Sequence, residues 1–108
     1  MLPSHAKNDA VPVTEGDIII AGTNGLFDNL FDEEIITAAE EALHDAFDKD
    51  RELAAKLAEL IVRKAISASL DSNVKSPFSF QANKLGMSYS GGKPDDTTVI
   101  VSLVTRLA

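Results

Sequence analysis

The sequence predicts an α+β domain in which an antiparallel sheet is covered on one face by a hairpin of two helices. The sheet is indicated by apolar runs near both ends of the chain, at residues 18–21 and 97–104. The helices are indicated by apolar residues that recur at helical spacing through residues 32–47 and 50–65. The expected element order is therefore strand, strand, helix, helix, strand.

The first two strands are expected to form a hairpin. Residues 11–13, Val-Pro-Val, suit a short edge strand, where a proline is tolerated because no neighbour needs its missing N–H. Residues 14–17 are typical of a turn. Ile18, Ile19 and Ile20 follow without a polar interruption, which indicates a strand that is covered on both faces.

The helical hairpin begins at an acidic cap. Asp32 is a better N-cap than Asp28, because Glu33 and Glu34 then lie in the first turn, near the positive end of the helix dipole. Asp50 is expected to cap the second helix. The predicted buried stripe of the two helices consists of Ile35, Ile36, Ala39, Ala42, Leu43, Ala46, Phe47, Leu53, Leu57, Leu60, Ile61 and Ala65.

The segment between the second helix and the last strand is rich in Ser, Asn and Gly. We expect a long loop over residues 70–94. The β-branched and apolar residues from Thr97 to Val104 then predict the last strand.

A polar residue stands close to one end of each of the two long apolar runs. Asn24 follows the first run, and Asp95 precedes the last one. If the two strands pair in antiparallel fashion, these residues lie at the same end of the sheet. Such a placement can build a metal or phosphate site from residues that are distant in the sequence.

Composition limits the classes of function. A chain of 108 residues makes one domain, residues 1–108, whose first ten residues are polar and expected to be flexible. The net charge of −7 argues against nucleic acid and against an anionic membrane surface as partners. No apolar run approaches the roughly 20 residues of a membrane span. The absence of cysteine excludes disulfides and thiolate chemistry.

Three motifs occur in a specific order along the chain. Residues 23–29 read Thr-Asn-Gly-Leu-Phe-Asp-Asn, and residues 93–100 read Lys-Pro-Asp-Asp-Thr-Thr-Val-Ile. Between them stand Ser-Pro-Phe at residues 76–78 and Gly-Gly-Lys at residues 91–93. Together these motifs resemble the metal-dependent protein phosphatases of the PP2C type. The resemblance is strongest to the subgroup that includes mitochondrial and chloroplast phosphatases of plants and animals.

The resemblance implies a C-terminal portion of a larger α/β/β/α sandwich that hydrolyses phosphoserine and phosphothreonine in proteins. In the family, two Mg²⁺ or Mn²⁺ ions activate a bridging water, because bound metal lowers the pKa of water. Asp95 matches a metal-binding Asp of the family, whereas Asn24 stands where the family has another Asp. An amide oxygen brings no charge, so the resemblance implies a degenerate metal site and a chain that is inactive alone.

Each candidate residue also has a structural interpretation. Asp95 is typical of a turn before a strand, and Asn24 of a tight Asn-Gly turn in which Gly25 permits the conformation. Asp28 suits a hydrogen-bonding or capping role. Asp96 suits a role in orienting the loop around it.

The predicted sheet has a second apolar face. Neighbouring residues at 18–20 and 99–101 are all apolar, so both faces of the sheet are apolar, and the helices cover only one. This favours an alternative function: a non-catalytic interaction or regulatory module, a homodimer or a complex with a protein partner. A phosphoprotein substrate is expected only for an active enzyme. For a soluble intracellular protein, the compartment stays open among chloroplast, mitochondrion and cytoplasm.

Overall fold

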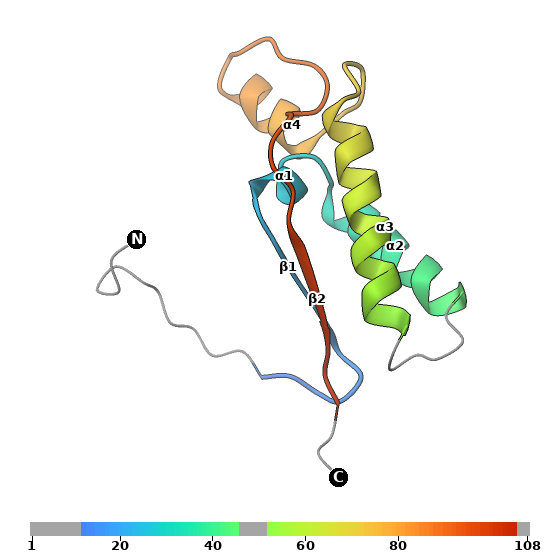
Figure 1. Ribbon diagram of the computed structural model, residues 1–108. Coiled ribbons are helices and arrows are strands. Elements are labelled where there is room, and N and C mark those ends of the chain that lie inside the picture. The colour runs from blue at the N-terminus through green and yellow to red at the C-terminus, as the bar shows by residue number, and fades with distance from the viewer. Residues whose placement is uncertain (1–11, 46–51, 106–108) are drawn as a thin grey trace.

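The computed structural model describes residues 12–45 and 52–105 of the chain. Within these ranges a strand is followed by four helices and a second strand (Figure 1). The elements are β1 (Ile18–Gly22), α1 (Asn24–Phe27), α2 (Asp32–Asp45), α3 (Glu52–Ser69), α4 (Pro77–Lys84) and β2 (Val99–Leu103). The described part of the chain is α+β, as the sequence predicts. No helix in it is long and apolar enough to cross a membrane.

The sheet joins the two ends of the described chain. β1 and β2 pair in antiparallel fashion, with Ile18 opposite Leu103 and Gly22 opposite Val99. Because the strands come from distant parts of the sequence, their pairing closes the segment between them into one unit (Figure 1). The antiparallel pairing that the two apolar runs predict is confirmed.

The two faces of the sheet differ in burial. Five side chains of one face pack against the helical core: Ile18, Ile20, Val99, Val101 and Leu103. The opposite face carries Ile19, Ala21 and Ile100, of which Ile19 is 45% exposed and Ile100 is 61% exposed. Since alternate residues of a strand point to opposite faces, the described helices leave this second apolar face uncovered.

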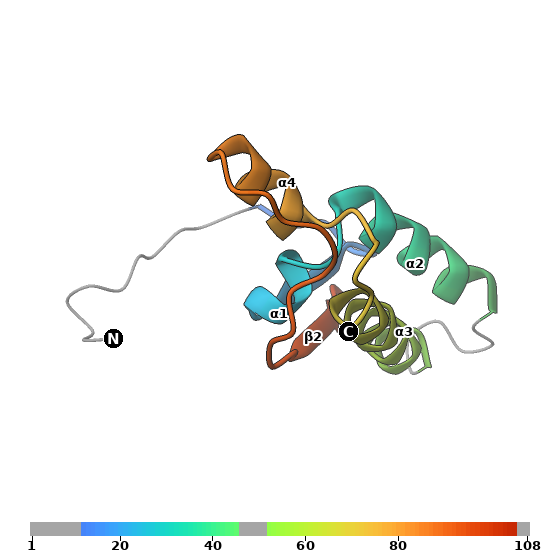
Figure 2. The ribbon, with the colours of Figure 1, turned by 90° about the horizontal axis from the view of Figure 1, so that it is seen from above.

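Helix α3 is the centre of the core. It packs against α1, α2 and β2, as Figure 2 shows from above. Leu57, Ile61 and Ala65 lie one turn apart along it and are fully buried. Burying a Leu or Ile side chain stabilises a fold by about 1.5–3 kcal/mol, so this stripe is a main source of stability.

Helix α2 begins at Asp32, which is therefore the first helical residue and not the predicted N-cap. The Phe31 N–H before it donates to Glu34 Oε1 at 2.9 Å. The acidic first turn is therefore confirmed, while Asp50 lies outside the described residues. The buried positions of α2 are Ile35, Ala38 and Ala42. Ala46 and Phe47 of the predicted stripe lie outside the described residues. The prediction that Ile36 is buried is wrong: its side chain is 56% exposed, because it lies beside the narrow row of residues that faces α3.

The predicted hairpin at the start of the chain is wrong for the residues that the structure describes. Of residues 11–13, residues 12–13 lie outside any strand, and the partner of β1 is β2. A turn at Thr14–Asp17 leads into β1. In this turn Gly16 has a φ of 93° and donates its N–H to the Val104 carbonyl at 2.8 Å. The turn therefore bonds to the end of β2, and not to residues 12–13.

The prediction of one loop over residues 70–94 is also wrong, because α4 lies inside it. Ser76 caps this helix: its Oγ accepts the Ser79 N–H at 3.1 Å, and Ser79 Oγ accepts the Ser76 N–H at 2.9 Å. Pro77 stands at the start of the helix, where its fixed φ is favourable. This reciprocal capping outweighs the weak helical periodicity of a short segment.

Candidate functional site

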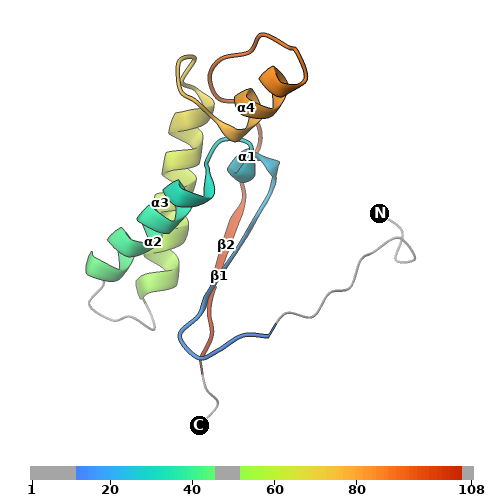
Figure 3. The ribbon, with the colours of Figure 1, turned by 180° about the vertical axis from the view of Figure 1, so that it is seen from behind.

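The segments after β1 and before β2 meet at one end of the sheet (Figure 3), and Thr23 joins them. The Thr23 N–H donates to the Thr98 carbonyl, and Thr23 Oγ1 accepts the Thr98 N–H, both at 3.1 Å. Thr23 Oγ1 also donates to the Asp96 carbonyl at 3.0 Å. Asn24 follows Thr23 and Asp95 precedes Asp96, so the structure places both candidate ligands on these neighbouring segments.

The candidate ligands themselves are exposed. Asn24 is the first residue of α1, where the sequence suggests a tight turn. Its carbonyl accepts the Asp28 N–H at 2.8 Å, while its side chain faces solvent. Asp95 Oδ1 accepts the Asp96 N–H at 2.8 Å. One oxygen of Asp95 is thus used to shape its own loop.

Gly25 is buried where α1 touches the segment before β2. A Cβ at this position would overlap the Asp96 carbonyl oxygen and lie 2.5 Å from Thr97 Oγ1. The φ of Gly25 is not positive. The glycine therefore serves a close approach of two segments, and not the tight turn that the sequence suggests.

A buried amide that sequence reasoning missed holds the same two segments together. Asn29 is 1% exposed. Its Nδ2 donates to the carbonyls of Gly25 and Lys93, both at 2.9 Å, and its Oδ1 accepts the Lys93 N–H at 2.8 Å. A buried amide is tolerated when its polar atoms are bonded in this way. The only signal in the sequence is an Asn that ends a motif, a residue type that is common in ordinary turns.

Lys93 is also held through its side chain. Its Nζ lies 3.6 Å from Asp28 Oδ2 and 4.7 Å from the centre of the Phe78 ring. The Phe78 N–H in turn donates to the Asp28 carbonyl at 3.0 Å. Asp28 therefore links α4 to the segment that leads into β2, and its carboxylate faces a lysine.

The residues just before Lys93 are packed against α3 and α4. The Tyr89 hydroxyl donates to the Gly92 carbonyl at 2.7 Å, and Ser76 Oγ donates to the Gly91 carbonyl at 2.8 Å. A Cβ on Gly92 would overlap the carbonyl oxygen of Ala68 in α3. The path of the chain toward Asp95 is therefore fixed from several sides.

The oxygen donors at this end of the sheet do not make a complete Mg²⁺ or Mn²⁺ centre. These ions take several oxygen ligands, most of them charged. Asp95 offers one carboxylate, Asn24 a neutral amide, and Asp28 is paired with Lys93. Within residues 12–45 and 52–105, no three His, Cys, Asp or Glu residues lie together as a metal site requires.

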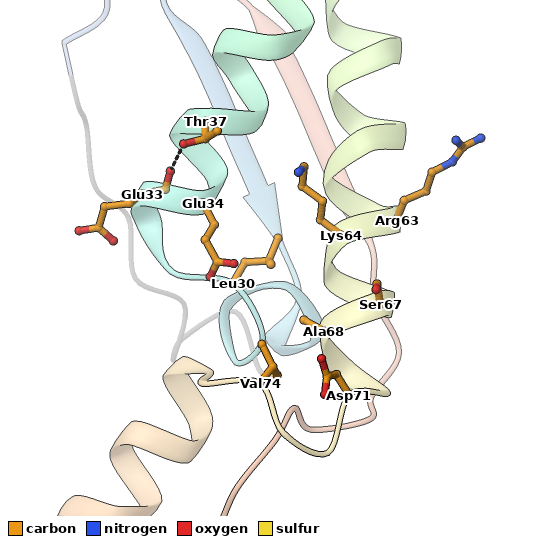
Figure 4. Close-up of a pocket in the computed structure, with 10 residues that line it drawn as sticks. All are labelled: Leu30, Glu33, Glu34, Thr37, Arg63, Lys64, Ser67, Ala68, Asp71 and Val74. Atoms are coloured by element: carbon orange, nitrogen blue, oxygen red, sulfur yellow. Dashed lines mark hydrogen bonds between the residues drawn. The ribbon is translucent and has the colours of Figure 1, made fainter.

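A separate groove of about 530 Å³ lies between α2 and α3 (Figure 4). Leu30, Ala68 and Val74 give it an apolar part, and Glu34 and Lys64 line it as well. None of the candidate ligands lines this groove. It is therefore distinct from the site at the end of the sheet.

Known proteins that resemble the chain are protein phosphatases. No protein-family model matches it. The "Probable protein phosphatase 2C 55" of Arabidopsis thaliana is 44% identical over 103 residues, which cover 95% of this chain and 21% of that protein. The "Protein phosphatase PTC7 homolog" of Homo sapiens is 35% identical over 104 residues, which cover 96% of this chain and 33% of that protein.

A solved structure has the same fold over most of the chain. The photosystem II phosphatase PBCP matches with a TM-score of 0.66 and 36% sequence identity, covering 90% of this chain and 39% of that one. The chain spans about a fifth to a third of the length of the two curated relatives. Sequence and fold agree over nearly all of its residues, and the chain belongs to the PP2C-type family of protein phosphatases.

Proposed function

We propose that this chain is a C-terminal portion of a metal-dependent phosphoserine/phosphothreonine phosphatase and does not hydrolyse phosphoesters by itself. The observation that carries the proposal is the placement of Asn24 and Asp95 at one end of the sheet, where only one of the two brings a charge. A two-metal centre needs several anionic oxygens around each ion. Among residues 12–45 and 52–105, too few of them lie at this place.

In this proposal Asp95 contributes one carboxylate and Asn24 one neutral oxygen to a centre whose remaining ligands come from outside residues 1–108. When bound, Mg²⁺ or Mn²⁺ supplies a water of lowered pKa as the nucleophile. Asn29 and Lys93 act on the main chain before Asp95, and so they set where its carboxylate lies. The substrate of the complete enzyme is then a phosphoprotein.

Hydrolysis of p-nitrophenyl phosphate with and without Mn²⁺ tests the proposal. We expect no Mn²⁺-dependent turnover from the wild-type chain or from the Asp95→Ala variant. The matched control is Asp32→Ala, which removes an exposed carboxylate at the start of α2. Turnover that needs Mn²⁺, survives in Asp32→Ala and is lost in Asp95→Ala would mean that residues 1–108 assemble a working site.

Binding of Mn²⁺ gives a readout that does not need activity. Water proton relaxation of Mn²⁺ solutions reports how much ion is bound to the chain. We expect Asn24→Asp to tighten binding by about tenfold, or ~1.4 kcal/mol, because it restores a charged oxygen beside Asp95. Equal affinities for the wild-type chain and Asn24→Asp would contradict the assignment of Asn24 to a ligand position.

A second function is favoured by the uncovered sheet face. We propose as the alternative that the chain is a non-catalytic module that pairs with a second copy or a protein partner through Ile19, Ala21 and Ile100. A hollow of about 250 Å³ on this face is lined in part by Ala21 and Ile100. Two sheets stacked face to face would bury it, as in the α/β/β/α sandwich that the family resemblance implies.

Light scattering tests the homodimer form of this alternative. At concentrations on the order of 10–100 μM, a micromolar affinity gives a dimer mass for the wild-type chain. Ile100→Glu should give a monomer, because it places a charge in the proposed interface. Ile36→Glu, at an exposed apolar position on α2, should remain dimeric. A monomeric wild-type chain would rule out the homodimer.

One observation supports a proposal for the cellular compartment. The similarity to a photosystem II phosphatase favours the chloroplast among the three compartments that the sequence leaves open. Immunoblots of fractionated organelles test this part of the proposal, and a signal confined to mitochondria or cytosol would contradict it.

A further inference from the structure

The segment around α4, residues 72–93, differs in charge from the rest of the protein. It contains Lys75, Lys84 and Lys93 and no acidic residue, whereas all 17 Asp and Glu residues of the chain lie outside it. The chain as a whole carries a net charge of −7. The α4 segment, as residues 72–93 are called below, is thus a basic region on an acidic protein.

Two of its lysines have no carboxylate partner within the part of the chain that the structure describes. Elsewhere in the described residues the basic side chains are ion-paired, Lys56 with Glu52, Arg63 with Glu59 and Lys64 with Glu41. Lys93 pairs with Asp28. Among the described residues, no ion pair involves Lys75 or Lys84, and both are exposed. Their charges are therefore available to an external anion.

The same segment exposes apolar surface. Phe80 is 55% exposed, Met87 is 56% exposed and Leu85 is 79% exposed. Lys84 Nζ lies 5.4 Å from the centre of the Phe80 ring, so charge and apolar surface are adjacent. Ser79 and Ala82 are buried, which shows that the opposite side of α4 faces the protein.

Hydrogen bonds and an aromatic contact within the α4 segment hold this surface in place. Asn83 Nδ2 donates to the Ser79 carbonyl at 2.8 Å and to the Tyr89 carbonyl at 2.9 Å, and Asn83 Oδ1 accepts the Tyr89 N–H at 3.2 Å. The rings of Phe78 and Tyr89 pack edge to face with centres 5.0 Å apart. In Figures 1 and 2, α4 projects beyond the end of the sheet, away from α2. A preformed, projecting surface loses little conformational entropy when it binds a partner.

We propose that the exposed side of the α4 segment, formed by Phe80, Lys84, Leu85 and Met87, is a docking surface for an acidic segment of a protein partner that also carries apolar side chains. Charge complementarity identifies this occupant. An acidic peptide is attracted to the basic segment and repelled by the rest of the chain, and this selects both the site and the partner. Apolar residues in the peptide would cover Phe80 and Leu85, since interface cores are built from such side chains.

Fluorescence anisotropy of a labelled peptide tests the proposal on the full chain. The probe is a short peptide in which Glu residues flank one Leu and one Phe, and its counterpart has Lys in place of every Glu. We expect the acidic peptide to bind and to weaken as salt is raised from about 50 to 300 mM, because the attraction is screened. The lysine peptide should bind at least about tenfold more weakly.

Matched variants locate the surface. Lys84→Glu should weaken binding of the acidic peptide by about tenfold, while Lys56→Glu, an equal charge change on α3, should leave it nearly unchanged. Phe80→Ser should weaken binding without changing the salt dependence. Leu85 lies just outside the helix, so Leu85→Ser repeats the apolar test if Phe80→Ser does not fold by circular dichroism.

Each possible result either supports or overturns the proposal. The docking surface is supported if the acidic peptide binds more tightly than the lysine peptide, and if this binding is weakened in Lys84→Glu and retained in Lys56→Glu. The proposal is overturned by no detectable binding at low salt, by equal binding of the two peptides, or by equal losses in Lys84→Glu and Lys56→Glu. None of these readouts depends on phosphatase activity.

Discussion

Asn29 and Lys93 are 64 residues apart in the sequence and are joined by two hydrogen bonds of opposite direction. The Lys93 N–H donates to Asn29 Oδ1 at 2.8 Å, and Asn29 Nδ2 donates to the Lys93 carbonyl at 2.9 Å. One side-chain amide thereby binds the main chain as a neighbouring strand would. The segment that carries Asp95 is thus positioned by a residue that is itself buried.

Replacing this amide should destabilise the fold. Asn29→Ala leaves the carbonyls of Gly25 and Lys93 and the Lys93 N–H without their partner. We expect a loss of roughly 2–4 kcal/mol in the free energy of unfolding, because unsatisfied buried groups cost about 1 kcal/mol or more each. Urea unfolding followed by circular dichroism measures it. The control Asn73→Ala, at an exposed position, should change stability by less than about 0.5 kcal/mol.

Gly25 should not accept a side chain. Gly25→Ala would force the Asp96 carbonyl away from α1 and cost roughly 1–3 kcal/mol, as overpacking does. The diagnostic readout is hydrogen exchange of the Thr98 amide, which bonds to Thr23 Oγ1 at this junction. Exchange of the Thr98 amide should accelerate by more than the loss in the global free energy of unfolding accounts for. In Gly86→Ala, a Cβ meets nothing within 4 Å but the φ of 84° disfavours a side chain, so the exchange of the Thr98 amide should follow the lowered global stability alone.

Ser76 should stabilise both α4 and the loop after it. Ser76→Ala removes the acceptor of the Ser79 N–H and the donor to the Gly91 carbonyl at a fully buried position. We expect a loss of about 1–2 kcal/mol, the usual effect of deleting an N-cap. Limited proteolysis should then cut within residues 70–94 first. If Ser88→Ala, at an exposed position, had the same effect, the capping role would be disproved.

The ion pair of Asp28 with Lys93 should contribute little to stability. Both side chains are partly exposed, 28% for Asp28 and 38% for Lys93, so solvent screens their attraction. A double-mutant cycle with Asp28→Asn and Lys93→Met should give a coupling energy below about 1 kcal/mol. The coupling should shrink further in about 1 M salt. A larger, salt-insensitive value would mean that the pair is a structural requirement.

The sequence predicted part of the candidate site, because the two segments that form it follow local sequence patterns. Asn24 and Asp95 each flank an apolar run, and the antiparallel pairing of those runs placed them at one end of the sheet. Asn29 could not be found in this way. A buried Asn and an exposed turn Asn look alike in a sequence, and they differ only in whether a distant carbonyl is within reach.

The errors in the fold have several origins. Residues 12–13 look like an edge strand, but β1 takes its partner from the other end of the chain. Helix α4 depends on a reciprocal cap between Ser76 and Ser79, which is local, and a weak apolar period concealed it. Ile36 fits the helical period and still lies outside the contact with α3.

The sequence by itself determined β1, β2, the two long helices and the family resemblance, because apolar periodicity and short motifs act over a few residues. Only the tertiary structure decided that Asn29 holds Lys93, that Gly25 is needed for a close approach to Asp96, and which face of the sheet stays uncovered. These facts depend on contacts between segments that are distant in the sequence, and the path of the whole chain sets such contacts.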